Sequence, residues 1–248
     1  MTRPPEATPL LSVTGLTKAF GGLHAVSACS FEIAPATIVG LIGPNGSGKT
    51  TVFNLITKLL RPDAGAVFFG GERIDGLKTY EIARRGIGRT FQAVKIFRDL
   101  TVWDNLSIAA MGRERVGWEP GATAWLGRLG LSHLRDDPAE SLSVGQQRLL
   151  ELAMNLVVDP PFLMLDEPLA GVHPLIRRQI AETVKALRVE GRTFLIIEHD
   201  MAFVMELCDK LVVMDHGEKI AEGPPAAIRR DPRVIDALLG QRRASMPA

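Results

Sequence analysis

The chain has 248 residues, and its 29 Lys and Arg residues nearly balance its 28 Asp and Glu residues, for a formal net charge of +1. This balance argues against a protein that attracts nucleic acid through a globally basic surface, and against an acidic disordered chain. A hydrophobic fraction of 46% is ordinary for a globular protein, and the length suits one domain, or one domain with a small subdomain.

The first part of the chain predicts short strands followed by a strand, a loop and a helix. Residues 1–9 are rich in proline, and we expect them to be disordered. The expected elements are strands at Leu10–Val13, Ala28–Ile33 and Thr37–Ile42, a turn at Gly21-Gly22, and a helix from about Lys49 to Lys58. A buried strand, a glycine-rich loop and a helix in this order indicate an α/β sheet.

Strands and helices alternate through the rest of the chain. The expected strands are Val67–Phe69, Ile87–Arg89, Phe162–Leu165, Phe194–Ile197, Leu211–Met214 and Lys219–Ala221. The expected helices are Thr101–Met111, Thr123–Leu131, Gly145–Val158, Pro174–Val189, Met201–Cys208 and a tail over Pro224–Leu239, with a loop at Gly112–Gly121. The region near 92–140 therefore predicts a mostly helical insertion in an α/β chain.

The cysteines and the apolar segments indicate the cellular compartment in which the chain is found. Cys29 and Cys208 are far apart in sequence, which argues against a disulfide framework or a zinc site. The longest segment without a charged residue, Ile33–Gly48, contains Pro, Asn and Gly, so no membrane span is expected. Residues 1–9 have no apolar segment of the kind found in signal peptides. We therefore expect a cytosolic chain that reaches a membrane only through a partner.

A phosphate-binding loop follows the strand at Thr37–Ile42. The segment Gly43-Pro-Asn-Gly-Ser-Gly-Lys-Thr50 fits the pattern G-x-x-x-x-G-K-[ST], in which backbone N–H groups and a helix N-terminus surround phosphate oxygens. Lys49 is expected at the β- and γ-phosphates, and the Thr50 hydroxyl at Mg²⁺. The predicted nucleotide-binding residues are Gly43, Pro44, Asn45, Gly46, Ser47, Gly48, Lys49, Thr50 and Thr51. The pattern alone leaves a kinase, a GTPase and an ATPase open.

Two acids follow a second buried strand. Phe162–Leu165 is apolar and ends at Asp166 and Glu167, where the carboxyl end of a parallel strand reaches the phosphate loop. Asp166 suits Mg²⁺, directly or through water, which leaves Glu167 free to orient and polarise an attacking water. The alternative is a helix cap, because these acids with Pro168 also resemble the start of a helix. The phosphate loop upstream favours the catalytic interpretation.

A third motif identifies a family resemblance. Leu142-Ser143-Val144-Gly145-Gln146 resembles the signature motif of ABC-type ATPases, usually LSGGQ, and it lies between the phosphate loop and the acidic pair, as in that family. The resemblance covers about residues 10–240. It implies an α/β fold with a P-loop ATPase core, an antiparallel β subdomain and a helical subdomain. It also implies one ATPase domain over 10–240, a helical subdomain over about 92–157 and a tail at 241–248.

The resemblance implies roles for individual residues. Phe20 matches the aromatic residue that stacks on adenine, although a core position in a small strand is the alternative. Gln92 matches the glutamine that touches Mg²⁺ or the attacking water, and His199 matches the histidine that contacts the γ-phosphate. The implied catalytic residues are thus Glu167, His199 and Gln92, and the implied Mg²⁺ residues are Thr50, Gln92 and Asp166.

The signature implies a dimer. Ser143, Gly145 and Gln146 lie at the expected start of a helix, which is a site for anions. In the family this site faces the γ-phosphate held by the other subunit, so two chains enclose two ATP molecules and hydrolysis opens the dimer. Two positions depart from the family pattern: Val144 replaces a glycine, and His173 stands where an aspartate is customary at the dimer contact.

Several segments resemble the ATP-binding subunits of branched-chain amino acid importers. They are Phe20–Val26, Arg89–Gln92, Leu100–Leu106, Pro168–Val172, Glu198–Met201 and Val234–Gly240. The resemblance implies a homodimer or a heterodimer with a paralogous ATPase, two permease subunits, an indirect periplasmic binding protein and a peripheral place on the cytoplasmic face of the inner membrane. The first permease contacts are expected near Val94–Leu100, after Gln92.

Other functions are less compatible with the sequence. An ATPase for lipid or lipopolysaccharide export would use the same motifs, so it remains an alternative. A soluble ABC ATPase acting on ribosomes or DNA is disfavoured, because the chain has one cassette, no coiled-coil heptads and no basic stripe. A P-loop kinase or GTPase is disfavoured by the signature and by His199. We expect no nucleic-acid partner.

Overall fold

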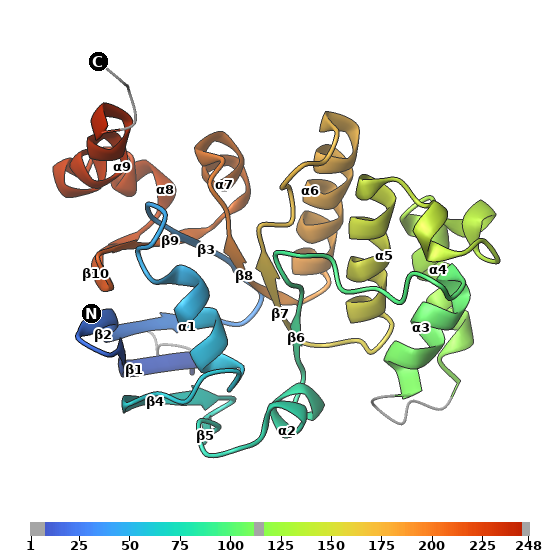
Figure 1. Ribbon diagram of the computed structural model, residues 1–248, viewed down its shortest axis with the longest axis horizontal. Helices are drawn as coiled ribbons and strands as arrows, with labels where there is room; N and C mark the ends of the chain where they lie inside the picture. The colour runs from blue at the N-terminus through green and yellow to red at the C-terminus, as the bar shows by residue number, and fades with distance from the viewer. Residues whose placement is uncertain (1–7, 112–116, 245–248) are drawn as a thin grey trace, which may run out of the picture.

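The computed structural model describes residues 8–111 and 117–244, and two β-sheets form its framework (Figure 1). The larger sheet has six strands in the order β10-β9-β3-β8-β7-β6. Its strands are β3 (Ile38–Ile42), β6 (Ile87–Arg89), β7 (Phe162–Asp166), β8 (Thr193–Ile197), β9 (Lys210–Asp215) and β10 (Glu218–Gly223). All neighbouring pairs are parallel except β10 with β9. The strands β3, β7 and β8 are buried throughout, because layers cover both faces of this sheet.

The smaller sheet is antiparallel. Its strands are β1 (Leu11–Phe20), β2 (Leu23–Ile33), β4 (Ala64–Phe69) and β5 (Glu72–Arg73), in the order β2-β1-β4-β5. The helix α1 (Lys49–Ile56) joins this sheet to the larger one, since one apolar cluster contains side chains of α1, of β1, β2 and β4, and of one face of the larger sheet.

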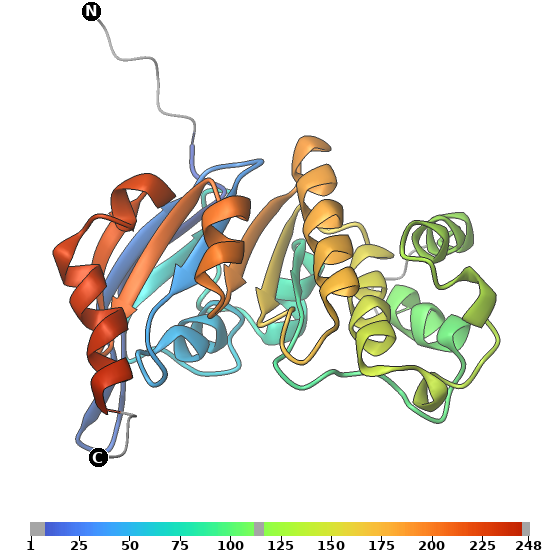
Figure 2. The ribbon, with the colours of Figure 1, turned by 90° about the horizontal axis from the view of Figure 1, so that it is seen from above.

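Most of the other described helices cover the opposite face and one end of the larger sheet; the exception is the helix over Thr79–Arg84, whose Ile82 belongs to the apolar cluster of α1 and the smaller sheet. These other helices are α2 (Thr79–Arg84), α3 (Val102–Met111), α4 (Glu119–Arg128), α5 (Val144–Leu156), α6 (Pro174–Val189), α7 (Met201–Leu207), α8 (Pro225–Ile228) and α9 (Pro232–Ala244). In both ribbon views α3, α4 and α5 lie together at the end of the molecule away from the four-stranded sheet (Figures 1 and 2). None of the helices described has the length and apolarity needed to cross a membrane.

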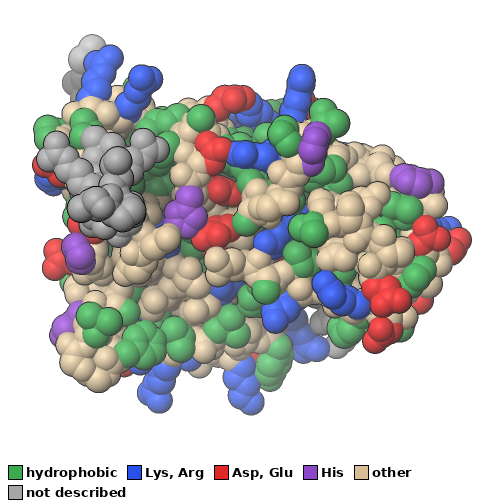
Figure 3. All heavy atoms as spheres, turned by 45° about the horizontal axis from the view of Figure 1, so that its top comes forward, with side chains coloured by type: hydrophobic (Ala, Val, Ile, Leu, Met, Phe, Trp, Pro, Cys, Tyr) green, Lys and Arg blue, Asp and Glu red, His purple; other side chains and the backbone are tan. Residues whose placement is uncertain are grey.

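Alternation along the strands divides the core in two. In β7, Leu163 and Leu165 belong to the cluster under α5 and α6, whereas Phe162 and Met164 belong to the cluster with α1 and the smaller sheet. Successive side chains of a strand point to opposite faces, so one short apolar strand supports both layers. Acidic and basic side chains are interspersed on the surface (Figure 3), in keeping with the balanced charge of the chain.

Most predicted elements are confirmed within one or two residues of their ends. The clearest differences in the smaller sheet are at β1 and β2, which are longer than expected and extend to the turn at Gly21-Gly22. Polar and half-buried residues alternate irregularly there, because β1 changes register near Gly15, whose φ is 58°. This bulge hides the period of two that marks a strand.

The other differences lie in the helical region, near the C-terminus and at two short elements. The helix predicted over Thr123–Leu131 is α4, over Glu119–Arg128, and the single helix predicted over Pro224–Leu239 is divided into α8 and α9. The loop expected at Gly112–Gly121 is wrong at its end, because α4 begins at Glu119; Pro120 occupies the first turn, where a proline is tolerated. Residues 112–116 of that loop, and residues 1–7 of the predicted disordered N-terminus, lie outside the described residues. The elements β5 and α2 were not predicted, since two and six residues are too short to show a period. Both cysteines are buried and free.

The link between the two sheets generates a stability prediction. The ring of Phe162 is fully buried, and its centroid lies 5.9 Å from that of Phe69 in the smaller sheet. Phe162→Ala is expected to lower the free energy of unfolding by about 3–5 kcal/mol, because it opens a cavity between the layers. Urea denaturation measures this change. Val189→Ala, at an 80% exposed position, is the control and should change stability by no more than about 0.5 kcal/mol. Equal effects of both substitutions would contradict this view of the core.

Candidate functional site

The predicted phosphate loop connects β3 to α1, and two of its glycines are required by packing. Gly43 has a φ of 149° and Gly48 a φ of 100°, both in the region that favours glycine. A Cβ atom on Gly43 would lie 2.1 Å from the carbonyl oxygen of Met214, and one on Gly48 would lie 2.3 Å from that of Ala25. The loop therefore lies directly against the backbone of β9 and β2.

The first turn of α1 is suited to an anion. No side chain caps this helix, and its first turn contains no acid, so its N-terminal N–H groups are not neutralised by the chain itself. Thr50 is exposed and Thr51 half-buried in this turn, while Asn45 and Gly46 are exposed at the tip of the loop. Ser47 is buried, and its carbonyl oxygen accepts a hydrogen bond from the Gly217 N–H at 3.1 Å.

Lys49 is the cation at this loop. Its side chain is buried, and Nζ donates to the carbonyl oxygens of Gly43 at 2.9 Å and Pro44 at 2.7 Å. Burial lowers the pKa of the Lys49 amine, and the charges of Glu167 and Asp166 oppose that shift. The amine is therefore held within the loop by acceptors that a phosphate oxygen can replace.

Asp166 lies at the end of β7 and carries an unsatisfied oxygen. It is 2% exposed, and its Oδ2 lies 3.4 Å from Nη2 of Arg89, whereas Oδ1 has no hydrogen-bond partner. Burial raises the pKa of the Asp166 carboxyl, and the Arg89 charge opposes that rise. Buried polar atoms without partners are rare in folded proteins, so the free Oδ1 indicates a ligand such as a cation or a water bound to one.

Arg89 was not predicted as a site residue. Its guanidinium donates to Thr57 Oγ1 at 2.8 Å and lies over the rings of Phe53 and Phe91, with its carbon 5.4 Å and 5.0 Å from the centroids. Burial lowers the pKa of Arg89, and Asp166 opposes that shift. The available signal in the sequence was a charged residue at the end of the short apolar strand β6.

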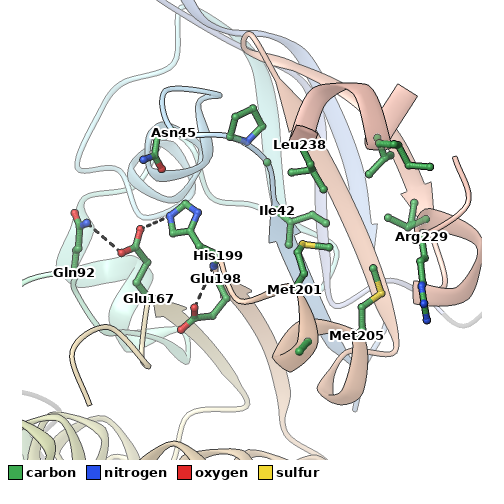
Figure 4. Close-up of a pocket in the computed structure, with 16 residues that line it drawn as sticks. Ile42, Asn45, Gln92, Glu167, Glu198, His199, Met201, Met205, Arg229 and Leu238 are labelled. Atoms are coloured by element: carbon green, nitrogen blue, oxygen red, sulfur yellow. Dashed lines mark hydrogen bonds and ion pairs between the residues drawn. The ribbon is translucent and has the colours of Figure 1, made fainter. Parts of the chain in front are cut away.

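Glu167 is held by two side chains from other segments. Its Oε2 accepts a hydrogen bond from Nε2 of Gln92 at 3.2 Å, and its Oε1 lies 2.7 Å from Nε2 of His199 (Figure 4). An ionised carboxylate only accepts hydrogen bonds, so a hydrogen bond between these two groups requires the tautomer of His199 that carries its proton on Nε2. The φ of Glu167 is 48°, and its N–H donates to the carbonyl oxygen of Ile197 at 3.0 Å. The structure thus brings together the predicted catalytic side chains Gln92, Glu167 and His199.

These side chains open into a pocket of about 910 Å³ beside the phosphate loop (Figure 4). Gly43, Pro44 and Asn45 of the phosphate loop line it, together with the apolar side chains of Met201 and Leu238. Glu198 lines it as well; its carboxylate is buried and accepts hydrogen bonds from the N–H groups of Leu169 at 2.9 Å and of His199 at 3.1 Å. Burial raises the pKa of Glu198, and these hydrogen bonds oppose the rise.

The signature residues lie elsewhere. Ser143 is the N-cap of α5: its Oγ accepts from the Gln146 N–H at 3.3 Å, and its own N–H donates to Gln146 Oε1 at 2.9 Å. Gly145 is buried against Ile176, where a Cβ would lie 3.0 Å from Cγ1. In both ribbon views α5 and α1 are separated by strands of the larger sheet (Figures 1 and 2). The start of α5 is therefore not beside the chain's own phosphate loop.

Two further sequence observations are sharpened by the structure. Phe20, at the end of β1, is 48% exposed, so the core position considered for it is wrong; Nζ of Lys18 lies 5.6 Å from its ring centroid. His173, which departs from the family pattern, is the N-cap of α6, where Nδ1 accepts the N–H of Leu175 at 3.3 Å. A helix cap accounts for this histidine in the single chain.

Comparisons with known proteins agree with this geometry. Residues 26–170 match the family model described as ABC transporter, and residues 218–243 match that of the branched-chain amino acid ATP-binding cassette transporter. The chain belongs to the ABC transporter ATP-binding proteins. Among them it is of the branched-chain amino acid type, and it is an ABC transporter ATPase.

Relatives span the whole ATPase chain. The high-affinity branched-chain amino acid transport ATP-binding protein LivG of Escherichia coli K12 is 41% identical, over 94% of this chain and 98% of its own length. BraF of Pseudomonas aeruginosa, with the same description, is 39% identical over the same shares. The lipopolysaccharide export protein LptB of Escherichia coli K12 is 36% identical, over 93% of this chain and 97% of its own.

A solved structure shows the same fold. An ATP-binding cassette of an ABC transporter in its ADP conformation superposes with a TM-score of 0.86 at 34% identity, over 94% of this chain and all of that chain. A nucleotide-free cassette gives a TM-score of 0.85 at 33% identity. The predicted fold class, an α/β P-loop ATPase core with an antiparallel β subdomain, is confirmed.

The buried pair of Arg89 and Asp166 generates the prediction from this site. Arg89→Met is expected to destabilise the chain by about 3–5 kcal/mol, because it leaves the Asp166 charge buried without a counter-ion. The double variant Arg89→Met/Asp166→Asn should be less destabilised than the sum of the two single variants. Urea denaturation of the four chains measures this coupling. The exposed pair Arg178–Glu182 is the control, with an expected coupling of about 0.3–0.5 kcal/mol. If the stability changes of the Arg89 and Asp166 substitutions were additive, the two side chains would not interact.

Proposed function

We propose that this chain hydrolyses ATP to drive the import of branched-chain amino acids or related small solutes. The observation that carries the proposal is the carboxylate of Glu167, held by Gln92 and His199 next to the phosphate loop. Relatives at 41% and 39% identity are transport ATP-binding proteins for branched-chain amino acids, and the match over residues 218–243 favours import over the export function of LptB.

In this proposal the phosphate loop binds the ATP phosphates. Backbone N–H groups at the start of α1 face the phosphates, and Lys49 exchanges its bonds with the Gly43 and Pro44 carbonyls for phosphate oxygens. Phe20 stacks on the adenine ring, for which its exposed position at the end of β1 is suitable.

Mg²⁺ fits the donors beside Asp166. The candidate ligands are Thr50, Gln92 and Asp166, and the free Oδ1 of Asp166 supplies the oxygen chemistry that this ion requires. When bound, Mg²⁺ neutralises charge that develops on the phosphates. Arg89 holds Asp166 in place on the side away from that oxygen.

Glu167 orients and polarises the attacking water. Its two carboxylate oxygens are directed by different partners, so the side chain is held in one position at the end of β7. Nε2 of His199, which lies 2.7 Å from Oε1 of Glu167, donates its hydrogen bond to a γ-phosphate oxygen when ATP is bound. Gln92 contacts the catalytic carboxylate, and the residues that follow it in the chain, Val94–Leu100, are the proposed permease contacts.

The dimer completes the site. Ser143 and the N–H of Gly145 form an anion site at the start of α5, away from the chain's own phosphate loop. We therefore propose that they contact ATP held by a second chain, which is either a copy of this one or a paralogous ATPase.

The permeases are proposed to dock beside Gln92. The segment Val94–Leu100 carries Phe97, which is 49% exposed, and a neighbouring cavity of about 380 Å³ includes Phe91, Lys95 and the exposed Leu59. Two permeases and an indirectly coupled periplasmic binding protein complete the proposed transporter. The chain then acts as one ATPase domain over 10–240, with a helical subdomain over about 92–157, on the cytoplasmic face of the membrane.

The first test of this function removes the catalytic carboxylate. Glu167→Gln is expected to bind ATP normally, to lose about 100-fold or more of its ATPase activity and to accumulate as an ATP-bound dimer, because the amide does not accept the proton from water. Steady-state ATPase assays and gel filtration with ATP measure both effects. Glu182→Gln, on the exposed surface of α6, is the control. An undiminished rate in Glu167→Gln would show that another group activates the water.

The second test addresses the dimer. Ser143→Arg is expected to abolish hydrolysis and ATP-dependent dimerisation while the monomer still binds nucleotide, because the substitution places a bulky side chain where the partner's phosphate lies. Equilibrium nucleotide binding and ATPase assays separate the two effects. Ser132→Arg, at an exposed position of the same helical region, is the control. Normal ATPase activity of Ser143→Arg would argue against a site shared between chains.

A further inference from the structure

Two buried charges on α5 lie just beyond the signature. Arg148 is 7% exposed and Glu151 is 3% exposed, and their Nη1 and Oε2 atoms are 3.2 Å apart. They are three residues apart and so share one face of the helix. Buried charges are unfavourable unless they are fully paired, so a chain that keeps two of them inside needs further partners for them.

Those partners are backbone groups of the segment that contains Gln92. Nη1 of Arg148 donates to the carbonyl oxygen of Phe91 at 2.8 Å, and Nη2 donates to that of Gln92. Oε1 of Glu151 accepts the N–H groups of Phe91 at 3.3 Å and Lys95 at 3.2 Å. Burial raises the pKa of Glu151, and the hydrogen bonds from Lys95 and Phe91 oppose that rise.

This arrangement matters because the segment has no regular structure of its own. Residues 91–97 belong to no strand or helix, so their backbone groups need partners from elsewhere. The side chain of Gln92 is exposed and contacts Glu167 at 3.2 Å. The Arg148–Glu151 pair therefore fixes the backbone from which Gln92 reaches the catalytic carboxylate.

The same helix begins at Ser143, five residues before Arg148, which is about 7.5 Å along the axis. A displacement of the start of α5 is transmitted to the Arg148–Glu151 pair, because a short helix moves as a rigid body. The hydrogen bonds from Arg148 and Glu151 to the backbone of residues 91–95 then carry it to Gln92 in the same chain.

We propose that Arg148 and Glu151 are positioning residues that couple the two nucleotide sites of the dimer. Engagement of Ser143 with ATP held by the partner shifts α5, and the pair places Gln92 against Glu167 and the attacking water of the chain's own site. The inference rests on the proposed function, because it requires the shared dimer site. It predicts that hydrolysis at one site depends on nucleotide at the other.

The test compares Arg148→Met and Glu151→Gln with the wild-type chain as the ATP-hydrolysing dimer. Both variants should bind ATP with unchanged affinity, since the phosphate loop is untouched. The kcat should fall about 5- to 150-fold, the range of typical coupling between sites, while the KM for ATP stays within about twofold. The Hill coefficient for ATP should fall toward 1. Arg148→Lys, which retains a cation that reaches a carbonyl, should recover part of both kcat and cooperativity.

The controls separate coupling from folding. Arg178→Met and Glu182→Gln remove a matched pair on the exposed surface of α6, 2.8 Å apart, and should leave kcat and the Hill coefficient unchanged. If Arg148→Met does not fold, Glu151→Gln decides the question, because its amide oxygen still accepts one backbone hydrogen bond while the charge is removed. Wild-type kcat and Hill coefficient in a folded Glu151→Gln would overturn the inference. Loss of kcat with an unchanged Hill coefficient would also overturn it, since that result would mean that the pair supports only the site in its own chain.

The failure of this inference is distinguishable from failure of the proposed function. If Glu167→Gln and Ser143→Arg abolish hydrolysis but the Arg148 and Glu151 variants behave as wild type, the ATPase mechanism stands and the coupling path is wrong. If Ser143→Arg retains full activity, there is no shared site for the pair to connect.

Discussion

The register of three neighbouring strands determines where the chemistry of this chain is located. Leu41 of β3 pairs with Ile197 of β8, and Ile197 pairs with Asp166 of β7, so these residues form one row across the parallel sheet. The phosphate loop starts two residues after Leu41, Glu167 directly follows Asp166, and His199 comes two residues after Ile197. Parallel pairing brings these segments to the same edge of the sheet, although more than a hundred residues separate the first from the others.

Burial of charge at that edge is the second constraint. Asp166, Glu151 and Glu198 are almost fully enclosed, and burial raises the pKa of each. Each carboxylate is stabilised differently: Asp166 by the Arg89 guanidinium, Glu151 by Arg148 and backbone N–H groups, and Glu198 by backbone N–H groups alone. The backbone partners of Glu151 and Glu198 lie outside the strands, whereas the contact of Asp166 joins the neighbouring strands β6 and β7. Gln92, Glu167 and His199 therefore each lie in or directly beside a backbone segment that is held by a buried charged side chain.

The sequence predicted the architecture, and it predicted three side chains that the structure brings together beside the phosphate loop. Apolar runs such as Phe162–Leu165 predicted the strands, and the motif order predicted that Gln92, Glu167 and His199 belong together. The supporting charges Arg89 and Glu151 were not predicted. Motifs report residue types at fixed spacing, whereas these charges depend on contacts between segments distant in sequence. Irregular β1 was underestimated for a related reason, since its bulge at Gly15 removes the alternation that marks a strand.

The close approach of Gly43 to Met214 and of Gly48 to Ala25 also has an evolutionary meaning. Neighbouring backbone atoms leave no room for a side chain at these two positions, whether or not a nucleotide is bound. A descendant that had lost hydrolysis would still need them in order to fold, and its phosphate-loop motif would look intact. The exposed side chains of Gln92 and His199 are under no such demand from packing. In a copy of this ATPase that had lost its activity, we therefore expect substitutions to accumulate first at Gln92, His199 and Glu167.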